Sequence, residues 1–243
     1  MAIMMGLEMR PSEIEVKRRE WRLRHIDNIL ALLYPELEKP LKECKVLDVG
    51  CGVGVLSLPI AERVKFLCGI DINPTAIKKA RERAAADEIK NVEFRVESIL
   101  DSTMYEEFDI VLLSDVIEHV AEQEQALRKA IRALEHGGVF YLTTNNKLWP
   151  IEGHKYLPFL SYLPRHWANR YVRLVKGEGD YEGYYLLTYT QLKKLLNSLP
   201  ITYTFKPPPA PDRLLYKIGT RLVRLHPHFW MFANAFLVIG KKI

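Results

Sequence analysis

Three closely spaced glycines constrain this 243-residue chain more than any other feature. The stretch from Val46 to Gly54 reads VLDVGCGVG, an apolar run that contains Asp48 and is followed by glycines at alternate positions. The run from Lys45 to Val49 predicts a short buried strand, and the apolar periodicity from Val53 to Val64 predicts a helix. Glycines between a strand and a helix let a ligand approach bare backbone. The stretch therefore predicts a site for a nucleotide-like ligand.

Strands and helices alternate along most of the remaining sequence. Between the apolar strand segments lie helical segments that start near Pro74 and Glu122. Such alternation is typical of an open, mostly parallel sheet with helices on both faces. The predicted strands are 45–49, 65–71, 92–96, 109–113, 139–144, 201–205 and 235–239. The sequence thus predicts an α/β, Rossmann-like sheet of seven strands.

Proline, glycine and threonine mark three helix boundaries. Pro59 predicts that the helix after the glycines is kinked or starts late, because an interior proline costs about 3 kcal/mol. The run His136-Gly137-Gly138 predicts a glycine cap for a helix over Glu122 to Leu134. Thr190 predicts the start of a helix that continues through Leu196.

The chain is expected to form one domain with additions. Residues 1–40 read as an N-terminal helical cap, with a helix from Pro11 to Leu33, and 41–146 as a cofactor-binding core. Residues 147–188 read as an aromatic insertion over the substrate, and 189–243 as the completion of the same sheet. The insertion either contacts a ring-containing acceptor or packs its rings onto the sheet. Its aromatic residues are Trp149, Tyr156, Phe159, Tyr162, Trp167, Tyr171, Tyr181, Tyr184 and Tyr185.

Composition bounds the class of protein. The apolar fraction of 48%, the charged fraction of 27% and the net charge of +5 are ordinary for a globular protein. The three cysteines have no C-x-x-C spacing, which argues against a disulfide framework or a metal site and favours a reducing compartment. No apolar stretch is long enough to span a bilayer. We therefore expect a cytoplasmic protein.

Acidic residues narrow the ligand of the glycine stretch. A dinucleotide fingerprint has the spacing G-x-G-x-x-G, whereas here the third glycine comes one position early and position 55 is valine. Asp48 would oppose a pyrophosphate but suits a cationic sulfonium. Asp71 ends the second strand 21 positions after Gly50, where an acid binds ribose hydroxyls in nucleotide folds. The alternative role for Asp71, capping the next helix, can be filled by Asn73.

Four motifs in order carry a resemblance to a known family. They are VLDVGCGVG, GIDIN, FDIVLLSDVIEHV and LEHGGVFYLTTNN, all between positions 44 and 146. The chain resembles the class I S-adenosylmethionine-dependent methyltransferases and is similar to their ubiquinone-biosynthesis O-methyltransferase group. The resemblance implies an antiparallel last strand, S-adenosylmethionine as cofactor, and methyl transfer to oxygen on a small-molecule or lipid-linked acceptor. The alternatives are a protein or RNA methyltransferase, or a catalytically silent S-adenosylmethionine-binding subunit.

The resemblance also implies where the cofactor lies. The glycine turn would lie under its methionine portion and ribose, and Asp71 would bind the ribose hydroxyls. Either Glu97 or Ser98 would take the adenine amine, and Asp115 would meet the amino group. The implied cofactor residues are Asp48, Gly50, Cys51, Gly52, Gly54, Asp71, Ile72, Glu97, Ser98, Ile99, Ser114, Asp115 and His119.

Two histidines are candidates for the catalytic base. His119 would lie near the reacting methyl group, and His154 lies within the aromatic insertion. The alternatives are local packing for His119 and a surface position for His154.

The sequence bears on macromolecular partners at two places. Methyltransferases that modify the amino groups of nucleic-acid bases commonly carry the motif N/D-P-P-Y/F after the fourth strand. This chain has Ser-Asp-Val-Ile there, starting at position 114, which argues against a nucleic-acid substrate. A basic amphipathic helix predicted over 212–225 is a candidate for contact with an anionic membrane surface, or packs on its own protein. Its basic residues are Arg213, Lys217, Arg221 and Arg224. No feature indicates the oligomeric state.

Overall fold

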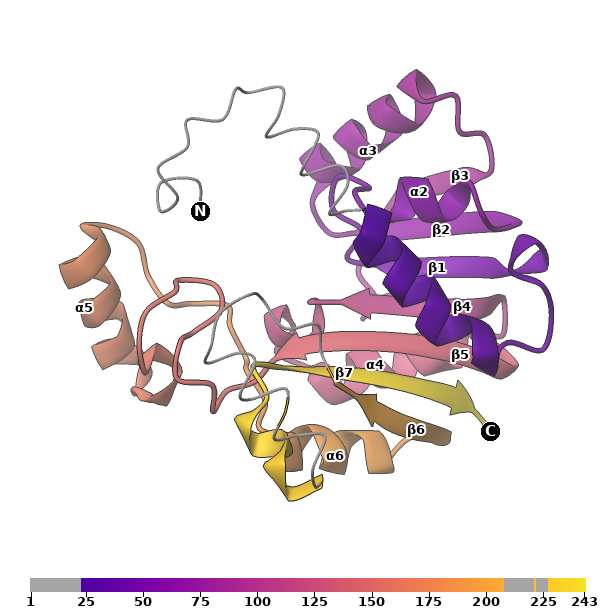
Figure 1. Ribbon diagram of the computed structural model, residues 1–243. Helices are drawn as coiled ribbons and strands as arrows, with labels where there is room; N and C mark the ends of the chain where they lie inside the picture. The colour runs from indigo at the N-terminus through magenta and orange to yellow at the C-terminus, as the bar shows by residue number, and fades with distance from the viewer. Residues whose placement is uncertain (1–22, 208–220, 222–226) are drawn as a thin grey trace.

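A seven-stranded sheet forms the centre of the computed structural model, which describes residues 23–207, 221 and 227–243. The strand order is β3-β2-β1-β4-β5-β7-β6 (Figure 1). The strands from β3 to β5 pair in parallel, and β7 runs antiparallel to both of its neighbours. The strands are β1 Lys45–Val49, β2 Phe66–Asp71, β3 Val92–Val96, β4 Phe108–Ser114, β5 Leu134–Asn145, β6 Ile201–Lys206 and β7 Ala235–Lys242. The predicted fold, including its antiparallel last strand, is confirmed.

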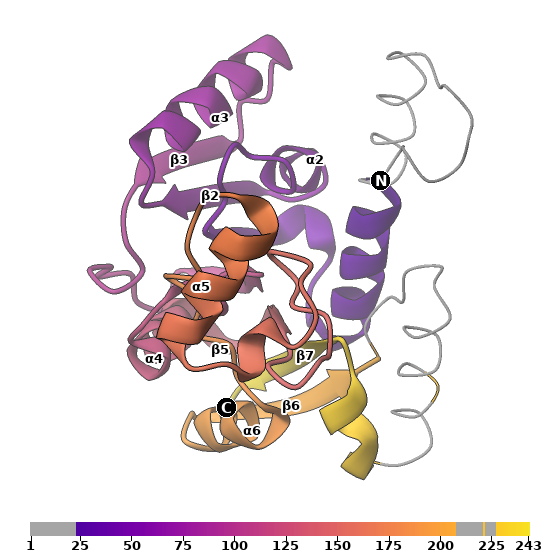
Figure 2. The same cartoon turned by 90° about the vertical axis from the view of Figure 1, so that its left-hand side faces the viewer.

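Helices cover both faces of this sheet (Figures 1 and 2). The helix over residues 23–33, α2 (Ser57–Ala61) and α3 (Pro74–Ala86) cover one face, and α4 (Gln123–Ala133) and α6 (Tyr189–Asn197) cover the other. Side chains alternate along a strand. Val46 therefore packs with Ile26 and Ile60, whereas its neighbour Leu47 packs with the cluster that contains Leu127. Burial on both faces explains the continuous apolar runs of the central strands.

The helix after the glycine turn starts late, as Pro59 predicts. It begins at Ser57, so Pro59 is its third residue rather than an interior one. The amides of a first helical turn have no partner within the helix, so proline removes no hydrogen bond there. The segment from residue 52 to 56 is instead a series of turns, which keeps backbone beside the carboxyl end of β1.

Two predicted caps were wrong. The helix α4 ends at Ala133 and β5 begins at the next residue, so Gly137 lies inside a strand instead of capping a helix. The pairing of β5 with β4 is irregular there, and Gly137 with its φ of +75° lies within that irregularity. The helix α6 starts at Tyr189, and its cap is Thr188, which forms a capping box with Gln191.

The insertion between β5 and α6 contains a helix that the sequence reading did not predict. It is α5, Arg165–Lys176, which follows a short 3-10 turn, Leu160–Tyr162. This part has its own small core, made of Leu157, Leu160, Ala168, Val172 and Tyr181. The insertion lies beyond the carboxyl ends of the parallel strands, with α5 in front of them in Figure 2. The boundaries proposed for the cap, core and insertion stay predictions.

Some predicted elements fall on residues that the structure does not describe. These are the first half of the N-terminal helix, residues 11–22, and nearly all of the basic helix over 212–225. Among the described residues, no helix is long and apolar enough to cross a membrane.

Candidate functional site

A cavity of about 370 Å³ lies at the carboxyl ends of β1, β2, β3 and β4. Parallel strands bring the segments that follow them to one edge of the sheet, and this edge is where open α/β sheets bind ligands. The volume is within the range of small-molecule sites. Most of the predicted cofactor residues line this cofactor cavity: Gly50, Asp71, Ile72, Glu97, Ser98, Ile99, Asp115 and His119.

The other predicted cofactor residues, Asp48, Cys51, Gly52, Gly54 and Ser114, lie outside the lining. Asp48 is buried and accepts a hydrogen bond from the Ser57 hydroxyl at 2.6 Å. The Cys51 side chain packs in the cluster beneath α3. Gly52 and Gly54 complete the turn, and the Ser114 hydroxyl lies 3.4 Å from that of Thr143. These residues lie next to the lining, and their direct contact with a cofactor stays a prediction.

The Asp71 carboxylate is held in place by backbone amides from two elements. One oxygen accepts the Gly52 N–H at 2.9 Å, and the other accepts the Asn73 N–H at 2.8 Å. The Asn73 side chain caps α3, as expected, by accepting the amides of Thr75 and Ala76. A carboxylate can accept about four hydrogen bonds. Asp71 therefore keeps acceptor capacity for the two hydroxyls of a ribose.

Gly50 stands where no side chain fits. Its φ is +68°, and a Cβ added to it would lie 2.6 Å from Cγ2 of Val116, which also lines the cavity. The backbone after β1 and the loop after β4 thus approach each other directly. The cavity wall at this point is peptide backbone, as the glycine spacing predicted.

The cofactor cavity is acidic. Four carboxylates line it, from Asp71, Glu97, Asp115 and Glu122, and no lysine or arginine does so among the described residues. Asp115 has a φ of +55°, a region that non-glycine residues seldom occupy and that is often found at functional sites. Its amide donates to both oxygens of Thr143 at 3.1 Å. Such a lining suits a cationic ligand and opposes a pyrophosphate.

Asp48 carries its charge at an energetic cost, because it is buried outside the cavity lining. Burial raises its pKa to about 6, the hydrogen bond from Ser57 opposes that rise, and the nearby Asp71 charge adds to it. The carboxylates in direct contact with the cavity are those of Asp71, Glu97, Asp115 and Glu122.

The two candidate bases meet at one side of the cofactor cavity. His119, at the end of the 3-10 turn Ile117–His119, lines the cavity, and its ring lies 5.0 Å from that of His154. Tyr184 contacts both, at 5.4 Å from His119 and 4.2 Å from His154 between ring centroids. Burial, and then the charge of His154, lower the pKa of His119, so this imidazole is neutral near pH 7.

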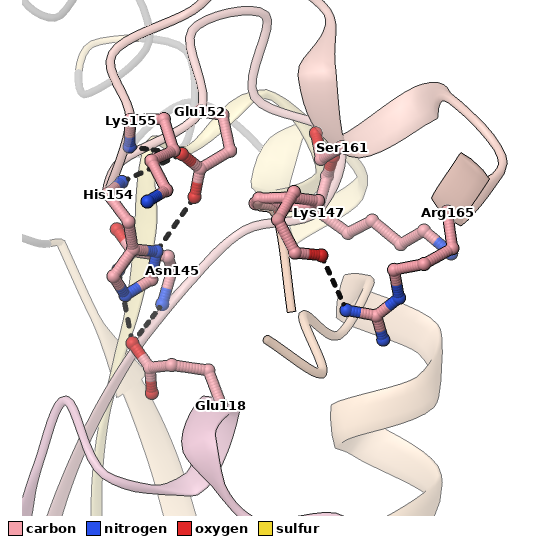
Figure 3. A network of polar contacts seen from close by, with 9 residues as sticks. Glu118, Asn145, Lys147, Glu152, His154, Lys155, Ser161 and Arg165 are labelled. Carbon is pink, nitrogen blue, oxygen red and sulfur yellow. Dashed lines mark hydrogen bonds and ion pairs between the residues drawn. The ribbon is translucent and has the colours of Figure 1, made fainter. Parts of the chain in front are cut away.

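His154 is oriented by a buried acid. Its Nδ1 lies 2.7 Å from Oε1 of Glu152, and the other Glu152 oxygen accepts the amides of His154 and Lys155 (Figure 3). Burial raises the pKa of Glu152, but these hydrogen bonds outweigh it and leave the pKa below its usual value. Glu152 is thus a carboxylate that fixes the ring of His154.

A second buried acid joins the core to the insertion. Oε1 of Glu118 accepts the Asn145 side-chain amide at 3.1 Å, and the Glu118 carbonyl accepts the Tyr185 amide at 2.7 Å. The Gln123 side chain donates to the carbonyls of Ile117 and Tyr185. Figure 3 shows Asn145 between Glu118 and the pair of Glu152 and His154. These contacts hold the insertion against the loop that carries His119.

Comparison with known proteins gives the same assignment as the motifs. The family model described as "Methyltransferase domain" matches residues 40–174. The chain belongs to this family of methyltransferases. The matched region includes the glycine turn, the cofactor cavity and both candidate bases.

Individual relatives of this methyltransferase confirm the resemblance stated above. It is 34% identical to the ubiquinone biosynthesis O-methyltransferase of Methylobacterium nodulans over 139 residues, 54% of each chain. It is 30% identical to the protein of that name from Bartonella quintana over 192 residues, 74% of this chain and 70% of the relative. The first alignment thus spans about half of the relative's length.

A solved structure shares the fold. An S-adenosylmethionine-dependent methyltransferase from Mesorhizobium loti aligns with a TM-score of 0.59 at 16% identity, over 87% of this chain and 96% of that one. At this identity the likeness concerns the fold alone.

The methyltransferase has a second cavity, of about 260 Å³, within the insertion. Tyr184 lines it, so the insertion cavity is connected through this ring to the histidine pair beside the cofactor cavity. Lys147 and Arg165 also line it. The many aromatic residues of the segment indicated a site here. No local sequence pattern identified Lys147 and Arg165 as its cations, or Glu152 as the partner of His154.

Proposed function

We propose that the chain transfers the methyl group of S-adenosylmethionine to a hydroxyl oxygen of a small-molecule acceptor. The observation that carries this proposal is the acidic cofactor cavity with the neutral His119 at one side. Membership of the methyltransferase family supports the type of reaction. The relatives' name, ubiquinone biosynthesis O-methyltransferase, supports oxygen as the methylated atom.

The cavity lining fits this cofactor. Asp71 would bind the ribose hydroxyls, Ile72 offers an exposed apolar surface to the adenine, and Asp115 would pair with the ammonium group. Glu97 is the better partner for the adenine amine, because it makes no hydrogen bond or ion pair with the described residues. The Ser98 hydroxyl, in contrast, accepts the Leu100 amide at 3.2 Å. When bound, the cofactor supplies an electrophilic methyl group on a sulfonium.

The protein's own task is to position the acceptor and remove its proton. His119 is the proposed general base, because it lines the cofactor cavity and is neutral near pH 7. Its ring would take the hydroxyl proton as the oxygen attacks. His154, held by Glu152, lies next to it and fixes the edge against which the acceptor packs. Alignment of the oxygen with the methyl group supplies the remainder of the rate enhancement.

The expected location is part of the same proposal. All three cysteines are free and buried, as expected of a protein in a reducing compartment. We therefore retain the cytoplasm as the predicted compartment.

The proposal is tested by incubating the purified protein with methyl-labelled S-adenosylmethionine and a panel of hydroxylated ring compounds, with RNA and a protein extract as parallel acceptors. Label on the oxygen of a small molecule is the expected result, and His119→Ala should slow its appearance by about 100-fold or more. Label on RNA or protein alone would contradict the proposal in favour of those acceptors. Cofactor binding without any transfer would favour a catalytically silent subunit.

A further inference from the structure

The insertion cavity carries positive charge. Lys147 and Arg165 line it together with Ser161 and three tyrosines, and none of its lining residues is acidic. Ser161 donates to the Lys147 carbonyl at 2.8 Å, and Arg165 donates to the Tyr181 carbonyl at 2.8 Å. Figure 3 shows Lys147, Ser161 and Arg165 grouped on one side of the insertion, away from the contacts of Glu152. Hydrogen bonds therefore fix the backbone of one cation and the side chain of the other.

Neither cation has a carboxylate partner among the described residues. The further contact of the Arg165 guanidinium is with the Tyr185 ring, at 5.8 Å from its centroid. Three acids of the insertion have other partners: Glu152 binds His154, Asp180 binds Arg173, and Glu182 accepts from the Asn169 side chain. Two cations that share a cavity repel each other, and an anion between them removes that repulsion. The cavity is therefore complementary to a negative group.

Tyr184 connects this cavity to the reacting side of the cofactor cavity. It lines the insertion cavity, and its ring contacts both His119 and His154. His119 in turn lines the cofactor cavity. A ring that packs on Tyr184 with its negative group at Lys147 and Arg165 would direct its opposite end toward the histidine pair.

We propose that the insertion cavity binds the acceptor by an anionic group, so that the acceptor is a hydroxylated ring that carries a carboxylate or a phosphate. This inference rests on the proposed function and adds the substrate class to it. Arg165 recognises either group through its guanidinium, Lys147 adds a point charge, and Tyr184 and Tyr185 supply ring surfaces. A neutral ring would leave both cations without a counter-charge.

Binding of matched probes tests the charge requirement. The probes are 3,4-dihydroxybenzoate, 3,4-dihydroxyphenylphosphonate and the neutral 3,4-dihydroxybenzamide, titrated by calorimetry into protein saturated with S-adenosylhomocysteine. At least one anionic probe is expected to bind about tenfold tighter than the amide, with a preference that falls as salt rises. The carboxylate and phosphonate titrations distinguish the two sources of charge. Equal affinity for all three probes, or no binding of either anion, would overturn the inference.

Substitutions in the insertion cavity test whether the preference for an anionic probe arises there. Lys147→Gln and Arg165→Gln are each expected to reduce the affinity for the anionic probe about five- to tenfold and to leave the amide unchanged. Arg170→Gln is the matched control, because Arg170 is on the same helix and lies over Trp167 rather than in the cavity. Arg165→Lys keeps the charge and should retain most of the preference. An unchanged preference in Lys147→Gln would contradict the inference, even where Arg165→Gln disturbs the fold of the insertion.

Titration of S-adenosylhomocysteine alone separates this inference from the proposed function. If that ligand does not bind, the proposed function fails. If it binds and the anionic probes have no advantage, only the substrate class fails.

Discussion

The cofactor cavity and the insertion cavity of this methyltransferase have linings of opposite charge and are connected through one group of rings. Carboxylates such as Asp71 and Asp115 line the cofactor cavity, whereas Lys147 and Arg165 line the insertion cavity. His119, His154 and Tyr184 stand between them. The difference indicates a division of labour: the acidic side suits a cationic methyl donor, and the basic side suits an anionic acceptor.

The cavities also differ in what builds them. The cofactor cavity is formed by segments that follow four parallel strands, so the sheet itself fixes its geometry. The insertion cavity belongs to a segment with its own small core around Leu160 and Val172. An acceptor site built on such an addition can change without altering the cofactor site. The Glu118 carbonyl and the Gln123 side chain bind the backbone of Tyr185, and the His119 ring contacts His154 and Tyr184, so these contacts join the two parts.

Substitution of His119, one of the rings between the cavities, should have the largest effect on the rate of methyl transfer. His119→Ala is expected to slow single-turnover methyl transfer by about 100- to 10,000-fold, the usual contribution of a general base. In the parent protein the rate should rise with pH through an inflection below 6.5, because burial lowers the pKa of His119 and only the neutral ring accepts a proton. A pH–rate profile of the parent and of His166→Ala, an exposed histidine on α5, is the comparison. Full activity in His119→Ala would remove this residue as the base.

The second test concerns the effect of the buried Asp48 charge on the stability of the folded protein. The folded pKa of about 6 lies above the ordinary value of 3.8, so the stabilisation from proton binding is complete below about pH 4 and is lost as pH rises through about 6. Asp48→Asn stays neutral and should exceed the parent in unfolding free energy by about 3 kcal/mol at pH 7.5. Near pH 4 the two should be similar.

Urea denaturation at both pH values measures this difference, and Ser57→Ala, which loses the hydrogen bond to Asp48, is expected to be less stable at each. An Asp48→Asn protein less stable than its parent at pH 7.5 would show that the charge of Asp48 is needed in the folded state. Asp48 would then belong with the charged residues of the cofactor side.

The third test concerns the backbone wall of the cofactor cavity. Gly50→Ala should weaken binding of S-adenosylhomocysteine at least about 100-fold, because the new Cβ would meet Val116. Gly177→Ala is the control, since Gly177 has a similar positive φ, with no atom within 4 Å of an added Cβ, and lies at the end of α5. Calorimetry measures both, and equal affinities would mean that the close approach at Gly50 does not shape the site.

The smallest expected effect concerns ribose binding. Asp71→Asn should reduce affinity for S-adenosylhomocysteine about tenfold, because one carboxylate oxygen that accepts hydrogen bonds becomes a donor. Asp87→Asn, at the exposed end of α3, should leave it unchanged. If the two variants bind alike, Asp71 is not the ribose ligand.

The cofactor side could be predicted from the sequence because its signals are local. Strand, glycine turn and acid lie within a few residues of one another, and parallel strands bring their ends together. Local signals gave a wrong prediction where strand pairing determined the secondary structure. Gly137 looks like a helix cap, yet pairing with β4 draws the chain into β5 directly after Ala133.

The insertion cavity could not be predicted in the same way. Lys147 and Arg165 are far apart in sequence, and they share a cavity only because the insertion folds back through the Ser161 and Tyr181 contacts. The pairing of Glu152 with His154 depends on burial that no periodicity reveals. The aromatic composition indicated a site without indicating its charge.

Calorimetric titration of the protein with S-adenosylhomocysteine and with NAD⁺ tests most directly whether the acidic cavity binds an S-adenosyl amino acid rather than a dinucleotide. We predict a dissociation constant below about 100 µM for S-adenosylhomocysteine and no binding of NAD⁺ at about 1 mM. Binding of NAD⁺ with equal or higher affinity, or no heat from S-adenosylhomocysteine at millimolar concentration, would contradict the assignment.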